Sequence, residues 1–290
     1  MKGLTEAIIL LAFLLFGSLV ILGFTVWYRL SQYKKSSYCA VTKRSYWSVI
    51  NEKGSAGEYW LYRKLCYRER MGERFLFNVY LPKENGETTE LDMLLLTKKG
   101  IFVFESKNYS GWIFGNASDR YWTQTLRTGN GVQKNRFYNP ILQNKNHALR
   151  LAEILGVEIP VYSIIVFSDR CNLENVQVGD EAVCVANRSV LSRVLRENWA
   201  SLPDCFSDAE DVRRLEEFLY PYSQTTEEER RAHVEHVKRD QAYAELAREE
   251  ICPRCGSALK VRTVSSGARA GARFLGCASY PRCRYTRNLE

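Results

Sequence analysis

The sequence has no internal repeat and no low-complexity tract, and it contains a single long run without charge. The first two absences exclude a repeat protein and a chain of biased composition. Hydrophobic residues make up 46% and charged residues 26% of the chain, which fits folded domains and excludes a polytopic membrane protein. A length of 290 residues allows one sizeable core and a small second module.

The cysteines also lack the even number and regular spacing of a disulfide framework. There are nine of them, and five are scattered: Cys39, Cys66, Cys171, Cys184 and Cys205. The other four lie close together near the C-terminus. This distribution excludes a secreted disulfide scaffold and predicts a reducing compartment with one metal site.

The single uncharged run covers Ala7–Tyr28. As a helix its 22 residues would be about 33 Å long, which exceeds the roughly 30 Å of a bilayer's hydrocarbon core. A cleaved signal peptide is the alternative, but the run is too long and no small-residue cleavage site follows it. We therefore predict a transmembrane anchor at residues 1–30.

Cations flank the run unevenly, with Lys2 alone before it. Five cations follow it closely: Arg29, Lys34, Lys35, Lys43 and Arg44. The positive-inside rule then places the bulk of the chain, C-terminal to the run, in the cytoplasm. We predict a single-pass protein of the plasma (inner) membrane, with a basic connector at residues 31–51 beside the lipid bilayer.

Charge reverses sign near the C-terminus, within a net charge of +8 for the whole chain. Residues 204–250 carry 14 acidic and 7 basic residues, a net of −7, whereas residues 252–290 carry 8 basic residues and one acidic residue, a net of +7. We predict an acidic helical linker at 201–250 and a basic module at 251–290. The positive module indicates an acidic partner such as nucleic acid.

Between residues 52 and 200 the spacing of apolar residues predicts an α/β domain. The core order is helix, three-stranded meander, helix and strand. Asn85-Gly86 predicts a hairpin turn inside the meander. The predicted helices are 56–70, 140–155, 189–199, 209–220 and 227–250, and the predicted strands are 75–81, 91–97, 101–105, 112–114, 121–126, 161–167 and 182–186.

Asp92 and the run Glu105-Ser106-Lys107 form the main candidate site. Side chains two apart in a strand share a face, so Glu105 and Lys107 project together, and a hairpin brings Asp92 beside them. Two carboxylates and a backbone carbonyl, such as that of Ser106, suit Mg²⁺ or Mn²⁺. The same spacing also arises by chance in exposed strands, so it leaves the chemistry open.

Four segments resemble the nuclease-related domain (NERD) family of the PD-(D/E)xK restriction-endonuclease-like superfamily. They are GSAGE at Gly54–Glu58, the stretch Thr88–Gly115, Trp122, and NPILQNKNH at Asn139–His147. The resemblance implies a restriction-endonuclease-like fold, with Asp92 and Glu105 as ligands of Mg²⁺ or Mn²⁺ and Lys107 as the catalytic lysine. It also implies that Glu58 supports the metal site and that Gln143 is the polar residue after the core motif. Ser106 departs from the small aliphatic residue usual there.

Other residues near these motifs have ordinary structural explanations. We expect Gly57 to permit close helix packing, and His147 to be a surface histidine. Trp112 and Trp122 have the chemistry to stack on bases, but packing in the core or at its edge is the expectation that we favour.

The C-terminal module has two closely spaced cysteine pairs, Cys252 with Cys255 and Cys277 with Cys283. Four thiolates in this arrangement suit a tetrahedral structural Zn²⁺. The module is too small to fold on apolar burial alone, so zinc binding would supply its folding free energy.

The stretch around these cysteines resembles the zinc ribbon at the C-termini of bacterial type I topoisomerases. The resemblance implies contact with nucleic acid, DNA including single strands. It does not imply topoisomerase activity, because the tyrosine strand-transfer domain is missing. Cations that can follow phosphates alternate with rings that can stack on bases: Lys260, Arg262, Arg273, Phe274, Tyr280, Arg282, Arg284 and Tyr285.

Taken together, these features favour a membrane-anchored, divalent-metal-dependent nuclease that acts on nucleic acid, with DNA as the favoured substrate. A non-enzymatic membrane tether, which binds DNA through the ribbon and carries a degenerate nuclease fold, is the main alternative. In a third possibility, the ribbon and the acidic helices bind protein partners. The presence of Asp92, Glu105 and Lys107 favours the enzyme.

Overall fold

The structure of the chain is a computed structural model. It describes residues 2–83, 86–129, 131–179, 183–226, 228–235, 237–238, 251–264 and 270–288. The chain divides into two compact units, Met1–Gln224 and Thr225–Glu290, and each is described by itself.

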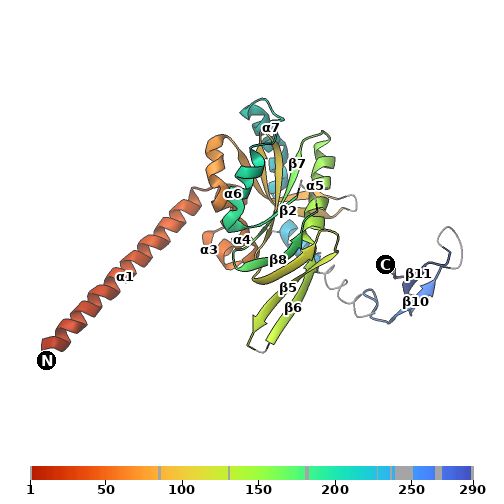
Figure 1. Ribbon diagram of the computed structural model, residues 1–290, viewed down its shortest axis with the longest axis horizontal. Coiled ribbons are helices and arrows are strands. Elements are labelled where there is room, and N and C mark those ends of the chain that lie inside the picture. The colour runs from red at the N-terminus through yellow and green to blue at the C-terminus, as the bar shows by residue number, and fades with distance from the viewer. Residues whose placement is uncertain are drawn as a thin grey trace. The chain divides into compact units, whose positions relative to one another are not determined.

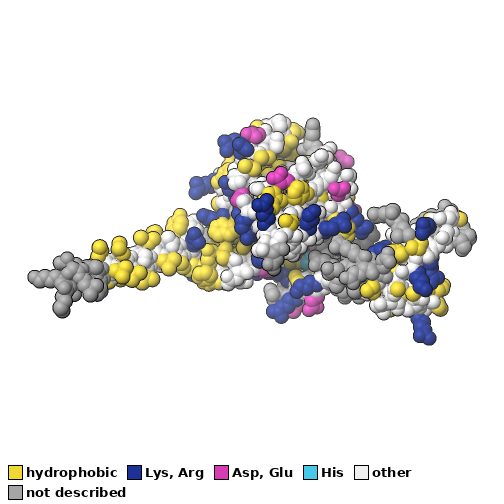
Figure 2. All heavy atoms as spheres, turned by 60° about the horizontal axis from the view of Figure 1, so that its bottom comes forward, with side chains coloured by type: hydrophobic (Ala, Val, Ile, Leu, Met, Phe, Trp, Pro, Cys, Tyr) yellow, Lys and Arg dark blue, Asp and Glu magenta, His cyan; other side chains and the backbone are white. Residues whose placement is uncertain are grey.

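The first unit begins with one long helix, α1 (Lys2–Lys34). Its segment Ile9–Lys34 is long and apolar enough to cross a membrane. Large apolar side chains cover this segment and remain exposed, among them Phe13 at 70% and Leu19 at 64%. Figure 2 shows them along the described part of the helix. Exposure of these side chains to water costs free energy, because the transfer of apolar surface out of water is favourable.

The C-terminal end of α1 enters the protein core. Tyr33 is 1% exposed, its hydroxyl donates to the Arg44 carbonyl at 2.7 Å, and its ring lies 5.2 Å from that of Tyr59. Two short helices follow, α2 (Ser37–Thr42) and α3 (Tyr46–Asn51), and they bury Tyr38 and Val49 in the same core. Residues 31–51, which the sequence predicted to be a basic connector, are thus packed against the domain by their tyrosines.

A five-stranded sheet forms the centre of this unit, in the order β1-β2-β3-β7-β9 (Figure 1). The first three strands pair antiparallel as the predicted meander, and β7 and β9 add to it in parallel. The strands are β1 (Arg74–Pro82), β2 (Thr88–Thr97), β3 (Gly100–Lys107), β7 (Val161–Phe167) and β9 (Val183–Asn187).

Helices cover both faces of this sheet because its strands carry apolar residues on both. One face packs against α4 (Lys53–Leu65) and α6 (Arg188–Trp199), together with the tyrosines described above. The other face packs against α5 (Pro140–Leu155) and α7 (Ala209–Leu219). The order helix, three-stranded meander, helix, strand confirms the α/β fold that the sequence predicted.

The alternation of inward-facing side chains shifts in the middle of β1. Phe75 and Phe77 face α4, whereas Val79 and Leu81 face α7. Asn78 lies between these pairs with a φ of 49°, a left-handed conformation that asparagine tolerates better than most residues. The shift lets the Asn78 side chain point toward α4, where it takes part in the candidate site.

A second sheet of four strands has the order β6-β5-β4-β8. Its strands are β4 (Gly111–Asn116), β5 (Tyr121–Thr128), β6 (Gly131–Tyr138) and β8 (Cys171–Gln177). Trp122 is fully buried in its core and stacks on Phe167 at 6.2 Å, which confirms the packing role expected for it. Gly115 is required there, because a Cβ at this position would lie 2.2 Å from the Trp122 ring.

The strands β6 and β8 were not predicted. Most of their residues are polar and exposed, so they lack the apolar alternation that indicates a strand. The first helix of the core, predicted at 56–70, is α4 (Lys53–Leu65) followed by the short helix η1 (Cys66–Met71). Asn85 and most of the predicted helix 227–250 lie outside the described residues.

We predict that Tyr33 is a folding residue of the domain, although it belongs to the apolar N-terminal helix. Tyr33→Ala in the full chain should lower the free energy of unfolding by about 3–5 kcal/mol, the usual range for removal of a buried aromatic ring. Tyr28→Ala, one and a half turns earlier and 50% exposed, is the matched control. Thermal unfolding in detergent measures both, and equal stability of the two variants would contradict the packing described.

Candidate functional site

The candidate site lies where β2 and β3 stop pairing. Their register ends at Met93 opposite Phe104, so the next pair would be Asp92 and Glu105. Instead of a ladder bond, the Ser106 backbone N–H donates to Asp92 Oδ2 at 2.7 Å. The two carboxylates are therefore neighbours at the point where the strands separate.

Lys107 links this pair to helix α5. Its Nζ donates to Glu105 Oε1 at 2.5 Å and to Gln143 Oε1 at 3.0 Å. His147, one turn after Gln143, places its Nδ1 3.4 Å from Glu105 Oε2 and is buried, so the expectation of a surface histidine was wrong. Asn144 fixes this helix, because its amide donates to the Val103 carbonyl at 2.9 Å.

Glu58 approaches the same region from α4 on the opposite face. Its Oε2 accepts from the Tyr38 hydroxyl at 3.2 Å and from Asn78 Nδ2 at 3.1 Å. Asn78 Nδ2 also lies 3.2 Å from Glu90 Oε1, so one amide bridges two carboxylates. Helix α4 comes this close because residue 57 is glycine. A Cβ added at this position would lie 3.1 Å from Ser106 Oγ. The packing role expected for Gly57 is confirmed.

Burial and like charge shape the ionisation of these groups. Burial raises the pKa of Asp92 well above its usual range, and Glu105 and Glu58 raise it further. Burial also raises the pKa of Glu58, to about 7, with a further contribution from Glu90. Burial lowers the pKa of Lys107, but Glu105 and Asp92 outweigh this effect and raise it above the usual value. Lys107 is therefore a stable cation.

The donor set fits a divalent cation. Three carboxylates, those of Glu58, Asp92 and Glu105, interact around a single ammonium, which leaves an excess of buried negative charge when all are ionised. Within the described chain, Glu105 Oε2 is buried and accepts no hydrogen bond. Oxygen ligands of this kind suit Mg²⁺ or Mn²⁺. The carboxylate oxygens of Glu58, Asp92 and Glu105 do not all lie within 4.8 Å of one another.

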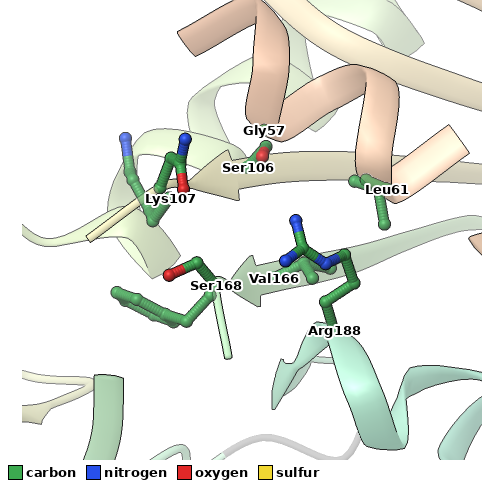
Figure 3. A pocket seen from close by; sticks show the side chains of 9 residues that line it. Gly57, Leu61, Ser106, Lys107, Val166, Ser168 and Arg188 are labelled. Carbon is green, nitrogen blue, oxygen red and sulfur yellow. The ribbon is translucent and has the colours of Figure 1, made fainter. Parts of the chain in front are cut away.

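A small pocket of about 10 Å³, room for roughly one water molecule, adjoins the end of β3. It is lined by Gly57, Ser106, Lys107, Asn108 and Arg188, among others. Arg188 extends from the start of α6 toward this pocket (Figure 3). Its Nη2 also lies 3.3 Å from Asp169 Oδ2. Sequence reasoning missed Arg188, which brings a second cation to the Lys107 end of the strand.

The second unit brings its four cysteines together. The sulfur atoms of Cys252, Cys255, Cys277 and Cys283 lie within 4.8 Å of one another, the arrangement of a structural zinc site. A small three-stranded sheet forms the rest of this module, with strands β10 (Leu259–Thr263), β11 (Arg273–Cys277) and β12 (Thr286–Asn288); Cys277 ends β11, and the other three cysteines lie outside the strands. Among the described residues of this unit, the buried core consists of Leu259, Leu275 and three of the cysteines, with Tyr285 packed against it, and this small core supports a folding role for the metal.

One face of this small sheet combines cations and rings. The register pairs Lys260 with Gly276 and Arg262 with Phe274, so Lys260, Arg262 and Phe274 share a face. The Arg262 guanidinium lies 5.5 Å from the centre of the Tyr280 ring. A Cβ at Gly276 would lie 2.9 Å from Arg262 Cδ. The lack of a side chain at residue 276 therefore leaves room for the Arg262 side chain to lie over the neighbouring strand.

The other predicted contact residues lie elsewhere in the module. Strand alternation places Arg273 on the opposite face from Phe274. Tyr285 is partly buried against the small core, while Arg282 and Arg284 are exposed beside Cys283.

Comparison with known families matches both units of the chain. Residues 53–168 match the family model described as nuclease-related domain, from the start of α4 to just after β7. Residues 249–290 match the model described as topoisomerase DNA binding C4 zinc finger, so the second unit carries a zinc ribbon of this type. Both resemblances stated from the sequence are confirmed.

A relative from Bacillus anthracis, described as an uncharacterized protein, is 35% identical over 126 residues. The aligned region is 43% of this chain and 58% of the relative, so the chain spans little more than half of the length of the curated relative that it matches. No solved structure matches the chain.

The nuclease-related domain brings together the residues that the sequence singled out. Lys107 joins Glu105 and Gln143 by hydrogen bonds, and Asp92, which accepts from the neighbouring Ser106 N–H, completes the group. Glu58 joins it electrostatically through Asp92. Sequence reasoning missed Asn78, which lies outside the quoted segments, and Glu90, which lies within the segment Thr88–Gly115 but was not singled out. The position of Glu90 two residues before Asp92 on β2 was the available signal.

We predict that the purified full chain holds about one Zn²⁺ and that Cys252→Ser loses it. The ribbon's proteolytic resistance should fall with the metal, because its small core cannot fold alone. Cys205→Ser, at an exposed cysteine outside the cluster, is the matched control and should keep the zinc. Metal content by elemental analysis and limited proteolysis measure the two effects. A Cys252→Ser protein with full zinc content and unchanged proteolysis would exclude the site.

We predict that the domain loses stability as pH rises when no divalent cation is added. Glu58 has a pKa of about 7 in the folded state and near 4.5 when unfolded, so between these values the folded state binds more protons. The free energy of unfolding should then fall by up to about 3 kcal/mol from pH 4.5 to above pH 7. Glu58→Gln should flatten this fall, whereas the exposed Glu197→Gln should not. Thermal melts over this range decide, and identical pH slopes would contradict the assignment.

Proposed function

We propose that this protein is a membrane-anchored, divalent-metal-dependent nuclease of the PD-(D/E)xK type, with a zinc ribbon that helps to hold nucleic acid. The observation that carries the proposal is the group at the end of β3, where Lys107 Nζ lies 2.5 Å from Glu105 and both interact with Asp92. The match to the nuclease-related family over the same residues supports it.

Asp92 and Glu105 would hold Mg²⁺ or Mn²⁺. The backbone adds a third oxygen, because the N–H and C=O of one strand residue point to the same side. Ser106 directs its N–H to Asp92, so its carbonyl faces the β2 side as well, and Lys107 directs its own carbonyl to Ser168 on the β7 side. When bound, the cation supplies electrostatic stabilisation of the charge that develops on a phosphodiester.

Lys107 would act on the water and the phosphate. Its ammonium remains charged in this acidic setting, so it can hold a water molecule in place and stabilise the negative charge of the attacked phosphate. Gln143 fixes the ammonium by accepting a hydrogen bond from it. Arg188, which lines the neighbouring pocket, would give a second positive contact to the phosphate backbone.

The remaining parts would bring nucleic acid to this site. Helix α1 would anchor the chain in a bacterial-type plasma membrane, with its bulk in the cytoplasm as the cations after it favour. The ribbon's Arg262, Phe274 and Tyr280 have the mixture of cation and rings that single strands bind. DNA is the favoured substrate because the family described for this ribbon binds DNA.

We expect the full chain in detergent to cleave DNA only when Mg²⁺ or Mn²⁺ is added. Asp92→Asn and Lys107→Gln should each lower the cleavage rate by at least about 100-fold, the scale of losing one group that stabilises transition-state charge. Gel-based cleavage of plasmid and single-stranded DNA measures the rate, with melting temperature as a check of folding.

Two exposed residues provide matched controls: Asp119→Asn in the turn before β5 and Lys64→Ala on α4 should leave the rate unchanged. Metal-dependent cleavage that persists in both site variants would assign the activity to a contaminant. Complete lack of cleavage, together with salt-sensitive DNA binding, would leave a membrane tether as the function.

A further inference from the structure

The sheet formed by β4, β5 and β6 has one buried face and one exposed face. Its inner face carries Ile113 and Trp122, both fully buried against the main core. Strand register places a second set of aromatic side chains on the outer face. They are Trp112, Phe114, Tyr121 and Tyr138. Phe114 and Tyr138 are 37% and 39% exposed, so helices do not cover this face as they cover the five-stranded sheet.

Cations lie among these rings. Arg127, Lys134 and Arg136 are exposed and project from the same outer face by strand alternation. The Arg127 guanidinium lies 5.2 Å from the Trp112 ring centre, and that of Arg136 lies 5.2 Å from the Tyr121 ring centre. None of the three forms an ion pair with the described residues. The three strands contain no Asp or Glu; the neighbouring carboxylates are Asp119 in the turn between β4 and β5 and Glu174 on β8.

We propose that this outer face binds single-stranded nucleic acid. Aromatic rings stack on unpaired bases, and guanidinium and ammonium groups neutralise the adjacent phosphates. In a duplex the base faces are already covered by neighbouring bases, so a flat sheet of rings favours a single strand. The face has a net charge of +3 on its three strands, which complements a polyanion.

The position of the face connects it to the candidate nuclease site. Strand β4 begins at Gly111, four residues after Lys107, so the two are at most about 14 Å apart along the chain. The Gln124 amide, on the inner face of β5, donates to the Ser110 carbonyl at 2.8 Å and ties the sheet to this connection. The β5–β6 hairpin extends from the domain body (Figure 1), so it offers a long contact surface. The inference that a nucleic-acid strand bound here continues to Lys107 rests on the proposed function. The proposed binding of nucleic acid to this face does not rest on it.

Equilibrium binding of fluorescent 20-nucleotide oligothymidylate and oligouridylate tests the proposal. The protein is the full chain in detergent with Asp92→Asn and without added Mg²⁺, so binding is measured apart from cleavage. Every sample also carries Arg262→Ala and Tyr280→Ala, which reduce the contribution of the ribbon to nucleic-acid binding. On this background Trp112→Ala should weaken binding by about tenfold with no change in its salt dependence, because it removes stacking alone.

Lys134→Gln with Arg136→Gln should also weaken binding. In addition, the slope of log Kd against log salt should become shallower by about 0.7 for each phosphate that the protein no longer neutralises. Trp112→Phe keeps a ring and should retain most of the affinity, which separates stacking from a general loss of packing.

Exposed residues of the same kinds serve as controls: Trp47→Ala on α3, and Arg193→Ala with Arg196→Ala on α6, should leave binding unchanged. Unchanged affinity and salt slope in the folded variants Trp112→Ala and Lys134→Gln/Arg136→Gln would overturn the proposal. So would a stronger loss for a 20-base-pair duplex than for the single strands. Oligothymidylate and oligouridylate together distinguish DNA from RNA. If the variants weaken binding while the wild-type chain cleaves nothing, the face stands and the nuclease proposal fails.

Discussion

The excess of buried negative charge around Lys107 is the constraint on which the rest of the first unit depends. Glu58, Asp92 and Glu105 interact around one ammonium, and burial makes each ionised carboxylate costly. Protons or a divalent cation can relieve that cost, so the ionisation of the site and its affinity for metal are linked. A chain selected for stability alone would not bury three carboxylates here, which is why this region is best explained by function.

Several elements hold these groups in place. Separation of β2 from β3 frees Asp92 to accept the Ser106 N–H, and α5 brings Gln143 and His147 to the other side of Lys107 and Glu105. Helix α4 carries Glu58 close to β3 because Gly57 has no side chain. The left-handed backbone at Asn78 turns its amide toward Glu58 and Glu90. Each arrangement has a local structural cost that is offset by the cores on both faces of the sheet.

Besides this negative site, the chain carries three positive surfaces. Arg188 lines the pocket beside Lys107, the outer face of the second sheet alternates Arg127, Lys134 and Arg136 with rings, and the ribbon carries Arg262 over Tyr280. A polyanion held by such surfaces would be brought to a cation bound between carboxylates, a division of labour in which cations bind phosphates and oxygen ligands bind metal. The apolar helix α1 ends in the core through Tyr33, so this helix and the domain are one continuous structure.

The sequence by itself determined the features that repeat along the chain or depend on spacing. These are the apolar helix, the three-stranded meander, helix α5, the cysteine pairs and the ordered motif around Asp92 and Lys107, because periodicity and residue order express them directly. Only the tertiary structure decided that Tyr33, Tyr38 and Tyr46 enter the core. It also decided that Asn78, Glu90, His147 and Arg188 join the site, and that β6 presents a basic, aromatic face. These facts depend on contacts between segments far apart in the chain and on strands too polar to show a burial pattern, and local periodicity contains no information on either.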